Sequence, residues 1–380
     1  MARKSAYILA LSCLTLCSCV SVKEQVKTPR LSWSVETFDD ASDHKQADLK
    51  LSPGDFGRVM HAQFDAQGDL HVVYVIKDRM VYAKRGHAPG ARQALVKEPL
   101  PLTVGEFARD IRVVTGSGLT AVAPGVHGLS YMQRVNDGWA VRLIADKIGQ
   151  ATLWTVTLGA QGNPVIAYAN ETGGIAFIEP EGAAWQEFRV PMAEEGWRLR
   201  CLTAAFDSQK RLHVGFVTSQ NDRVKLWHAV RDRAWSVEDP VYKGKRGEVE
   251  ACSAVFDGDL ALSAAVVVAE GANDRLIFIS RKGKKWQDEV LADPFIDEQH
   301  LALFSYVFDT AGRAHLVFYD AQAKTPVYLF KKPNGAWGKM SIGSAVDTQV
   351  RPTIAIDPSG KAWILFQDAA RNSLRLARQR

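Results

Sequence analysis

The sequence predicts an all-β fold, a seven-bladed β-propeller closed by an N-terminal strand that completes the last blade. Short runs of β-branched and aromatic residues alternate with Gly, Asn, Asp and Pro, which is the pattern of consecutive antiparallel strands. Groups of four such runs recur along the chain, and a sheet of four strands needs neighbours to cover both of its faces. The last group stops after three runs, and a matching fourth run stands near the N-terminus.

The clearest copy of the repeat covers residues 300–339. Its first apolar run ends in Phe308-Asp309, and an Ala-Gly turn leads to an alternating second run at 315–319. A third run lies at 327–330, and Asn334-Gly335 forms the turn before Trp337 on the fourth. Each run is of strand length and is bounded by turn residues, so we expect four antiparallel strands in each repeat.

The repeat occurs seven times, and its second copy is the most divergent. The copies cover 59–97, 109–144, 152–190, 200–238, 250–291, 300–339 and 351–378. The seventh copy lacks the Trp-bearing fourth run, whereas WSVE at 33–36 is identical to WSVE at 235–238, the fourth run of copy four. We therefore expect the N-terminal strand to close the ring, which leaves no long unpaired sheet edge.

The first 19 residues have the pattern of an export signal. Arg3 and Lys4 precede an apolar stretch at 6–16, and Leu16-Cys17-Ser18-Cys19 ends it. This ending resembles the bacterial lipobox, which implies that Cys19 is lipidated and, with Val20 after it, that the protein reaches the outer membrane. An ordinary cleaved signal peptide is the alternative. The apolar stretch is too short for a transmembrane helix. Residues 20–30 form a polar tether, and 31–380 form a single propeller domain.

Charge and cysteine content narrow the class of protein. Removing residues 1–19 lowers Lys plus Arg from 47 to 45 and leaves Asp plus Glu at 42, a balance too even for a nucleic-acid partner. Cys201 and Cys252 remain, at the starts of neighbouring repeats in an oxidising compartment, so a disulfide is possible. Cys201 lies six residues before its turn Asp and Cys252 five, and in a regular strand this offset points the two side chains to opposite faces.

The recurring D-x-x-G-x-x-H-x-x-Y, followed by a Tyr/Leu-rich strand and G-x-W, resembles the sialidase-like propeller repeats of exported bacterial proteins. The resemblance covers nearly all of the mature chain and implies the fold and a binding face. It does not extend to the reaction of sialidases. The chain has no S-x-D-x-G-x-T-W box and seven repeats rather than six, and Val350-Arg351-Pro352 only loosely matches the Arg-Ile-Pro start of the sialidase site.

Recurring His and Trp residues are interpreted as structural. His71, His213 and His315 each follow an Asp by six residues, and the same position is Trp or Ser in other repeats, so it serves a turn rather than a metal or an acid-base pair. One Trp per blade at the start of the outer strand fills the gap between adjacent sheets rather than forming a sugar platform. These tryptophans are Trp33, Trp139, Trp185, Trp235, Trp286 and Trp337. We expect no metal and no cofactor.

Arginines recur where the inner strands start. Five or six residues before the turn stand Arg58, Arg109, Arg200 and Arg351. Inner strands begin at one mouth of the central channel, so we expect these groups to ring that mouth, with His300 in a loop beside them as a further ligand candidate. Guanidinium forks bind carboxylate, sulfate or phosphate through two hydrogen bonds. The alternative is a solvated rim in which the arginines pair with Asp110, Glu248 and Glu250.

These residues predict a binding function. The sequence indicates a lipid-anchored propeller of the cell envelope that binds an envelope protein or an acidic glycan at the Arg-rich mouth. One alternative is a glycoside hydrolase or lyase that acts on an acidic glycan at the same mouth, with Asp297 and Glu298 as its carboxylates. Another is a scaffold in envelope assembly.

Overall fold

The structure is a computed structural model, in which Trp33–Arg380 form one compact unit. It describes residues 32–40, 56–86, 95–104, 110–115, 118–125, 127–136, 138–145, 153–159, 161–170, 173–181, 184–191, 196–238, 242–245, 247–270, 273–282, 285–292, 304–320, 323–343 and 350–380. Within these ranges, no helix has the length and hydropathy required to span a bilayer.

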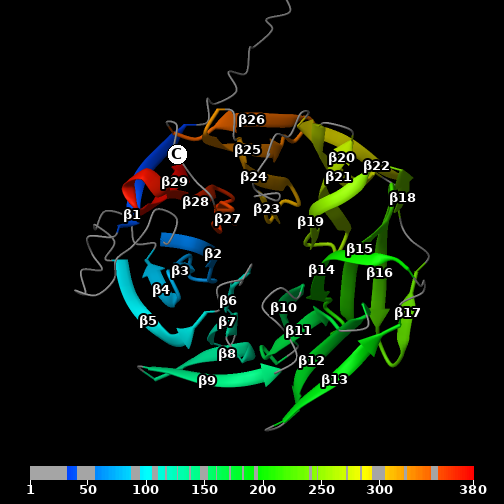
Figure 1. Cartoon of the computed structure of the whole chain (residues 1–380), viewed down its shortest axis with the longest axis horizontal. Helices are drawn as coiled ribbons and strands as arrows, with labels where there is room; N and C mark the ends of the chain where they lie inside the picture. The colour runs from blue at the N-terminus through cyan, green and yellow to red at the C-terminus, as the bar shows by residue number, and fades with distance from the viewer. Residues whose placement is uncertain are drawn as a thin grey trace, which may run out of the picture. The chain divides into compact units, whose positions relative to one another are not determined.

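Seven antiparallel sheets, the blades, make up the fold (Figure 1). The first three blades consist of β2 (Phe56–Phe64), β3 (Leu70–Ile76), β4 (Arg79–Arg85) and β5 (Leu95–Thr103); β6 (Arg112–Thr115), β7 (Leu119–Gly125), β8 (Gly128–Val135) and β9 (Gly138–Ala145); and β10 (Trp154–Leu158), β11 (Pro164–Ala169), β12 (Ile175–Glu181) and β13 (Ala184–Val190).

The next three blades follow the same order. They consist of β14 (Arg198–Phe206), β15 (Leu212–Gln220), β16 (Arg223–Arg231), β17 (Trp235–Val237) and β18 (Tyr242–Lys245); β19 (Glu248–Phe256), β20 (Leu262–Glu270), β21 (Asn273–Lys282) and β22 (Lys285–Ala292); and β23 (Phe304–Phe308), β24 (Ala314–Asp320), β25 (Thr325–Lys331) and β26 (Trp337–Ser341). In blade four, β17 and β18 both pair with β16, at opposite ends of that strand.

Blade seven closes the ring, as the sequence predicted. It consists of β27 (Thr353–Ile356), β28 (Ala362–Asp368), β29 (Ser373–Gln379) and, as its outer strand, β1 (Trp33–Asp40), with the 3-10 helix Ala369–Arg371 before β29. The pairing of β1 with β29 starts at Trp33 opposite Gln379 and is antiparallel. The inner strands β2, β6, β10, β14, β19, β23 and β27 contact one another in that order, and β27 contacts β2.

The outer tryptophans, which six of the seven blades carry, pack against the preceding blade, which confirms their predicted packing role. Trp139 meets Tyr82 of blade one, Trp337 meets Phe278 of blade five, and Trp33 meets Tyr328 of blade six, with edge-to-face rings whose centroids are 5.1–5.4 Å apart. Such pairs contribute about 0.5–1.5 kcal/mol each beyond the area that they bury. The N-terminal strand therefore bears the same interblade contact as the outer strands of blades two and six.

The turn between the first and second strands has a shared structure. Asp65 Oδ1 accepts hydrogen bonds from the N–H groups of Gln67 and Asp69, and its Oδ2 lies 2.9 Å from His71 Nε2. His71 Nδ1 lies 2.8 Å from the hydroxyl of Tyr82 on the third strand. Asp309 with His315, and Asp207 with His213, repeat the contact between carboxylate and imidazole. The histidines thus hold the turn to the sheet, as predicted.

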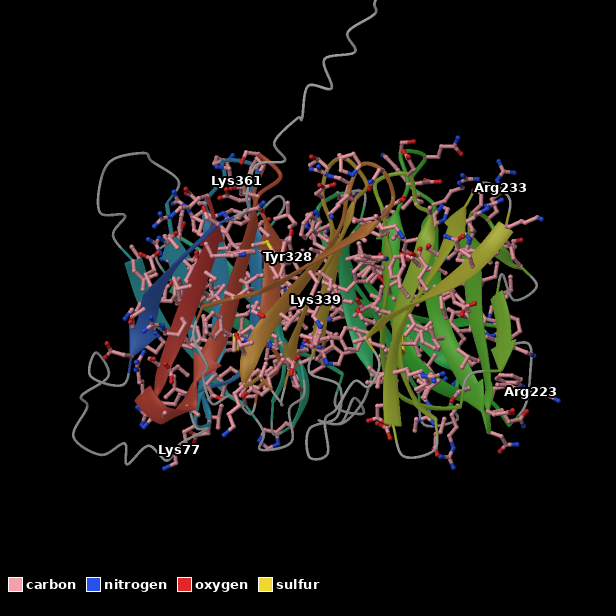
Figure 2. All side chains as sticks on the ribbon, turned by 90° about the horizontal axis from the view of Figure 1, so that it is seen from above. Lys77, Arg223, Arg233, Tyr328, Lys339 and Lys361 are labelled. Carbon is pink, nitrogen blue, oxygen red and sulfur yellow. A yellow bond between two sulfur atoms is a disulfide. The ribbon has the colours of Figure 1, made fainter. Side chains whose placement is uncertain are left out.

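Figure 2 shows which residues lie at each face of the ring. Lys361, in the turn after β27, and Arg233 lie at one face. Lys77, in the turn after β3, and Arg223, the first residue of β16, lie at the other. The strands of a blade are antiparallel, so each inner strand begins at the face of Lys77 and Arg223.

Candidate functional site

The inner strands align by their last residue, because in each blade that residue pairs with the first residue of the second strand, although the turn between them is two residues shorter in blade two. Counting back three residues gives a polar side chain in all seven blades. These residues, which we call the polar ring, are His61, Arg112, Thr155, Thr203, Ser253, Ser305 and Thr353. The seven inner strands surround the axis of the propeller. Residues at the same position of each strand therefore lie at one height along that axis and form a ring.

Neighbouring positions show that this polarity is local. In every inner strand the residues just before and just after the polar-ring member are apolar or aromatic, as in Ile111 and Val113 beside Arg112. The cores between blades contain both Ile111 and Val113. Thr353 is buried, whereas the other six members are partly exposed to solvent. The polar ring therefore borders water rather than filling the interblade core.

Charged groups gather on one arc of the polar ring. Arg112 donates from Nε and from Nη2 to Asp110 Oδ2, at 3.0 and 2.7 Å. Arg351, just before β27, donates from Nη2 to Asp110 Oδ1 at 2.9 Å. One carboxylate of blade two thus accepts from a guanidinium of its own strand and from a guanidinium of blade seven.

His61 lies between these blades and is uncharged. The N–H of Val113 donates to His61 Nδ1 over 3.2 Å, so the neutral ring carries its proton on Nε2. Burial, together with the positive charge of Arg112 and Arg351, lowers the pKa of His61 to about 3, against the opposing effect of Asp110. His61 is therefore a neutral hydrogen-bond donor at neutral pH.

We call His61, Asp110, Arg112 and Arg351 the Asp110 cluster. Burial alone would raise the pKa of Asp110, but Arg112, Arg351 and His61 outweigh burial and lower it, so the carboxylate is ionised. Two guanidinium groups, one carboxylate and a neutral imidazole give a formal net charge of +1. The side chains of Arg112 and Arg351 are 33% and 32% exposed and that of Asp110 is 17% exposed, so solvent reaches the cationic groups most.

Of the four predicted arginines, the structure describes the side chains of two. Arg351 belongs to the Asp110 cluster. Arg200, at a register shift of β14, donates from Nε to Ser219 Oγ at 2.7 Å and has an Nη2 atom 3.7 Å from the exposed Glu248. Both arginines thus have carboxylate partners, Asp110 and Glu248, that the solvated-rim alternative named. The side chain of Arg58, and Arg109, His300, Asp297, Glu298 and Cys19, lie outside the described residues.

The predicted arginines do not share one register. Arg351 stands five residues before the end of its inner strand, whereas Arg58, Arg109 and Arg200 stand six residues before theirs. In blade seven the sixth position is Val350, which is buried. The structure therefore links Arg351 to Asp110 and Arg112 rather than to Arg200.

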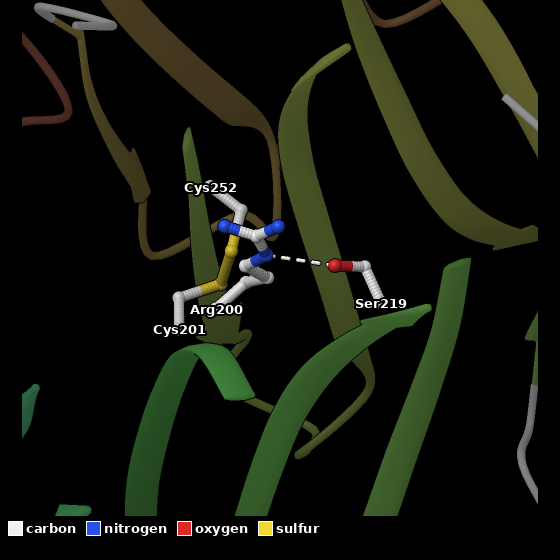
Figure 3. The surroundings of a disulfide bond; sticks show 4 residues. All are labelled: Arg200, Cys201, Ser219 and Cys252. Carbon is white, nitrogen blue, oxygen red and sulfur yellow. Dashed lines mark hydrogen bonds between the residues drawn. A yellow bond between two sulfur atoms is a disulfide. The ribbon is translucent and has the colours of Figure 1, made fainter. Parts of the chain in front are cut away.

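Cys201 of β14 and Cys252 of β19 form a disulfide between blades four and five, with Cα atoms 5.7 Å apart (Figure 3). The one-residue offset, which had argued against this bond, instead favours it. Adjacent blades face each other with opposite sides of their sheets, so a bond between blades joins residues that point to opposite sides. Figure 3 also shows the hydrogen bond from Arg200 to Ser219 beside this disulfide.

Sequence reasoning missed the polar ring and the role of Arg112. The signal was present, since the third residue before the end of each inner strand can be counted from the turn. The pairing of Asp110 with Arg112 and Arg351 could not be counted, because it joins blades two and seven across blade one. Among the described residues, no group of three or more His, Cys, Asp or Glu side chains could hold a metal ion.

No protein-family profile matches the chain. No curated protein matches its sequence either. Solved structures match it at low identity. Aleuria aurantia lectin in complex with Fucα1-6GlcNAc is 11% identical with a TM-score of 0.49, over 77% of this chain and 98% of the lectin. AofleA from Arthrobotrys oligospora is 10% identical with a TM-score of 0.47, over 90% and 85%.

A protein of unknown function from Dyadobacter fermentans is 11% identical with a TM-score of 0.49, over 91% of this chain and 99% of that protein. The chain is thus similar in structure to lectin propellers and to this bacterial protein. At these identities and TM-scores, the similarity carries no argument about the ligand of this chain.

Proposed function

We propose that this protein is a binding protein that holds a carboxylate-bearing partner, an acidic glycan or an acidic segment of an envelope protein, at the Asp110 cluster. The observation that carries the proposal is the shared carboxylate. Arg112 and Arg351 both bind Asp110, which fixes two guanidinium groups side by side and leaves the cluster with a positive charge.

The donors of the cluster are only partly used. A guanidinium has five N–H groups, and the hydrogen bonds to Asp110 employ two nitrogens of Arg112 and one of Arg351. Within the described residues, the remaining guanidinium nitrogens form no further hydrogen bond. Because Asp110 already orders both side chains, an incoming anion loses less free energy in immobilising them than it would with mobile arginines.

The cluster supports binding better than hydrolysis. Glycosidic cleavage by the usual route requires two carboxyl groups that flank the bond, one of them protonated. The Asp110 cluster supplies one carboxylate, and the adjacent guanidinium groups keep it ionised against the effect of burial. The hydrolase or lyase alternative would depend on Asp297 and Glu298, outside the described residues.

A calorimetric titration with an oligogalacturonate, and with a neutral oligosaccharide of equal length, tests the proposal. Arg351→Ala should weaken oligogalacturonate binding by about 10- to 100-fold, the range for hydrogen bonds to charged groups. The effect should shrink at high salt. Arg211→Ala, which removes a comparably exposed arginine beside the turn carboxylate of Asp207, is the control and should bind as the parent does. Equal affinities of Arg351→Ala and the parent would refute the proposal.

We further propose that Cys19 carries the lipid that anchors the protein to the cell envelope, in the outer membrane where one exists. The LCSC stretch at 16–19 supports this proposal. Cys19→Ser removes the thiol to which the lipid would be attached. Without the acyl chains that give a firm anchor, the protein should move from the membrane fraction to the soluble fraction of the envelope. A Cys19→Ser variant that is processed and still membrane-bound would contradict the proposal.

A further inference from the structure

Resting on the proposed function, we propose that the ligand is a sugar acid, whose carboxylate binds Arg112 and Arg351 and whose hydroxyl groups bind the polar ring. A sugar acid is the acidic-glycan member of the two partner classes above. The polar ring would distinguish such a hydroxylated carboxylate from other anions.

The composition of the polar ring favours such a ligand. Blades one and two contribute His61 and Arg112, and the other five blades contribute a hydroxyl group each, from Thr155, Thr203, Ser253, Ser305 and Thr353. A hydroxyl group both donates and accepts, so it pairs with a sugar hydroxyl in either sense. A site for a bare anion needs the cationic arc alone. It does not need hydroxyl groups at the same register of five further strands.

Arg112 belongs to both the Asp110 cluster and the polar ring, so the two sets of residues meet. Cys201 stands two residues before Thr203 of the polar ring, on the same side of β14, and is bonded to blade five, so the members of the polar ring point toward the next blade. Arg112 therefore points toward blade three, whose inner strand β10 contacts β6, and His61 of blade one points toward Arg112. Thr155, at the equivalent position of β10, is the next member of the polar ring around the axis and points on toward blade four, since Trp154 and Val156 pack against blade two. A carboxylate held by Arg112 thus lies between His61 and the row of hydroxyl groups that starts at Thr155.

An acidic peptide fits this arrangement less well. Its carboxylates would engage the guanidinium groups, but its aliphatic stem and backbone would leave the row of hydroxyl groups unmatched, and unmatched polar groups in a bound complex lower the affinity. A sugar acid places several hydroxyl groups around the same ring that bears its carboxylate.

Two carboxylates of similar size distinguish anion binding from sugar-acid binding. Glucuronate carries a carboxylate and hydroxyl groups, and cyclohexanecarboxylate carries the carboxylate alone. Glucuronate should bind the parent protein more tightly, by about tenfold or more if two or three hydroxyl contacts form. Arg112→Ala should lower the affinity for both ligands.

Thr155→Val removes one hydroxyl group and keeps the shape of the side chain. This substitution should lower the affinity for glucuronate by about two- to tenfold, which corresponds to one hydrogen bond. The affinity for cyclohexanecarboxylate should not change. Thr157→Val is the matched control, because Thr157 lies on the same face of the same strand but outside the polar ring. This variant should bind both ligands with the affinity of the parent protein.

The outcomes separate the two proposals. If Arg112→Ala weakens both carboxylates but the parent binds them equally, the binding function stands and the sugar-acid inference is wrong. The inference is also wrong if Thr155→Val and Thr157→Val weaken glucuronate alike, or if tetraglutamate binds more tightly than glucuronate. If no carboxylate binds, both proposals are wrong.

Discussion

Arg351 of the last blade donates a hydrogen bond of 2.9 Å to Asp110 of the second blade, 241 residues earlier in the sequence. The two residues flank blade one, whose His61 lies beside both of them. Because blade seven is complete only when β1 has paired with β29, the Asp110 cluster exists only in the closed ring. Ring closure and the candidate site are therefore coupled.

Asp39 anchors the closing strand to blade one. Its buried carboxylate accepts hydrogen bonds from Tyr74 of β3 and Lys97 of β5. Asp39→Asn should lower the free energy of unfolding by about 3 kcal/mol or more, because removing one partner of a buried ion pair leaves the other charge uncompensated. Urea denaturation followed by tryptophan fluorescence measures the change.

Glu36→Gln is the control for this prediction, since Glu36 lies on the same strand and pairs with Arg85 of blade one, but its side chain is 49% exposed. An exposed pair contributes about 0–1 kcal/mol, so this variant should unfold close to the parent. Equal losses in the two variants would show that Asp39 does not have the predicted role in closure.

Lys210 occupies a left-handed backbone position, with φ at 65°, at the place in the turn where Gly312 stands in blade six. Its side chain is exposed, so nothing is lost from the core when it is removed. Lys210→Gly should raise the free energy of unfolding by about 0.5–1 kcal/mol, since an L-residue in this region is strained.

Gly312→Ala provides the opposite test at φ 70°. An added Cβ there would meet no atom within 4 Å, so the expected loss of about 1 kcal/mol arises from the backbone alone. A neutral result for both variants would mean that the turn relaxes to other backbone angles.

The disulfide should stabilise the contact between blades four and five. Cys201 and Cys252 are 51 residues apart, and closing a loop of this length in the unfolded chain corresponds to about 2–4 kcal/mol. Reductant should therefore lower the Tm of the parent and leave that of the double Ala variant unchanged. Two free thiols in protein purified without reductant would contradict the bond.

Acid should weaken the fold through His61. The pKa of His61 is lowered from 6.5 to about 3 in the folded protein, so between these pH values the unfolded chain binds a proton that the folded chain excludes. The free energy of unfolding should fall as the pH drops from about 6.5 toward 3, whereas carboxylates with a lowered pKa, such as Asp309, act mainly below about pH 4.

His61→Asn keeps an acceptor for the N–H of Val113 and should reduce this dependence between pH 6.5 and 4. Burial also lowers the pKa of His228 and of His315, so these two residues should account for the slope that remains. His127→Asn, at an exposed turn residue, should keep the slope of the parent. A parent whose stability is constant between pH 6.5 and 4 would show that His61 is not held neutral by its surroundings.

The fold could be predicted from the sequence because its signals are local. Strands and turns alternate within each repeat, and the identity of residues 33–36 with 235–238 placed the closing strand in blade seven. Packing of the outer tryptophans followed from their recurrence once per blade. The split of the outer edge of blade four between β17 and β18 had no such signal.

The site was harder to predict because register and blade geometry decide it. The predicted ring joined arginines that stand five and six residues before the turn, but Arg351 and Arg200 occupy different positions, and a register shift beside Cys201 places Arg200 in an irregular part of β14. Asp110 was predicted as a partner of the arginines, but the roles of Arg112 and His61 depend on contacts between blades, from Arg351 to Asp110 and from Val113 to His61.

A crystal structure of the protein grown with glucuronate, at a concentration that saturates binding, tests whether the Asp110 cluster is the binding site. We expect the carboxylate of glucuronate within hydrogen-bond distance of Arg112 and Arg351, and its hydroxyl groups against members of the polar ring, His61 among them. Glucuronate bound elsewhere on the protein, with the Asp110 cluster unoccupied, would show that the cluster is not the binding site.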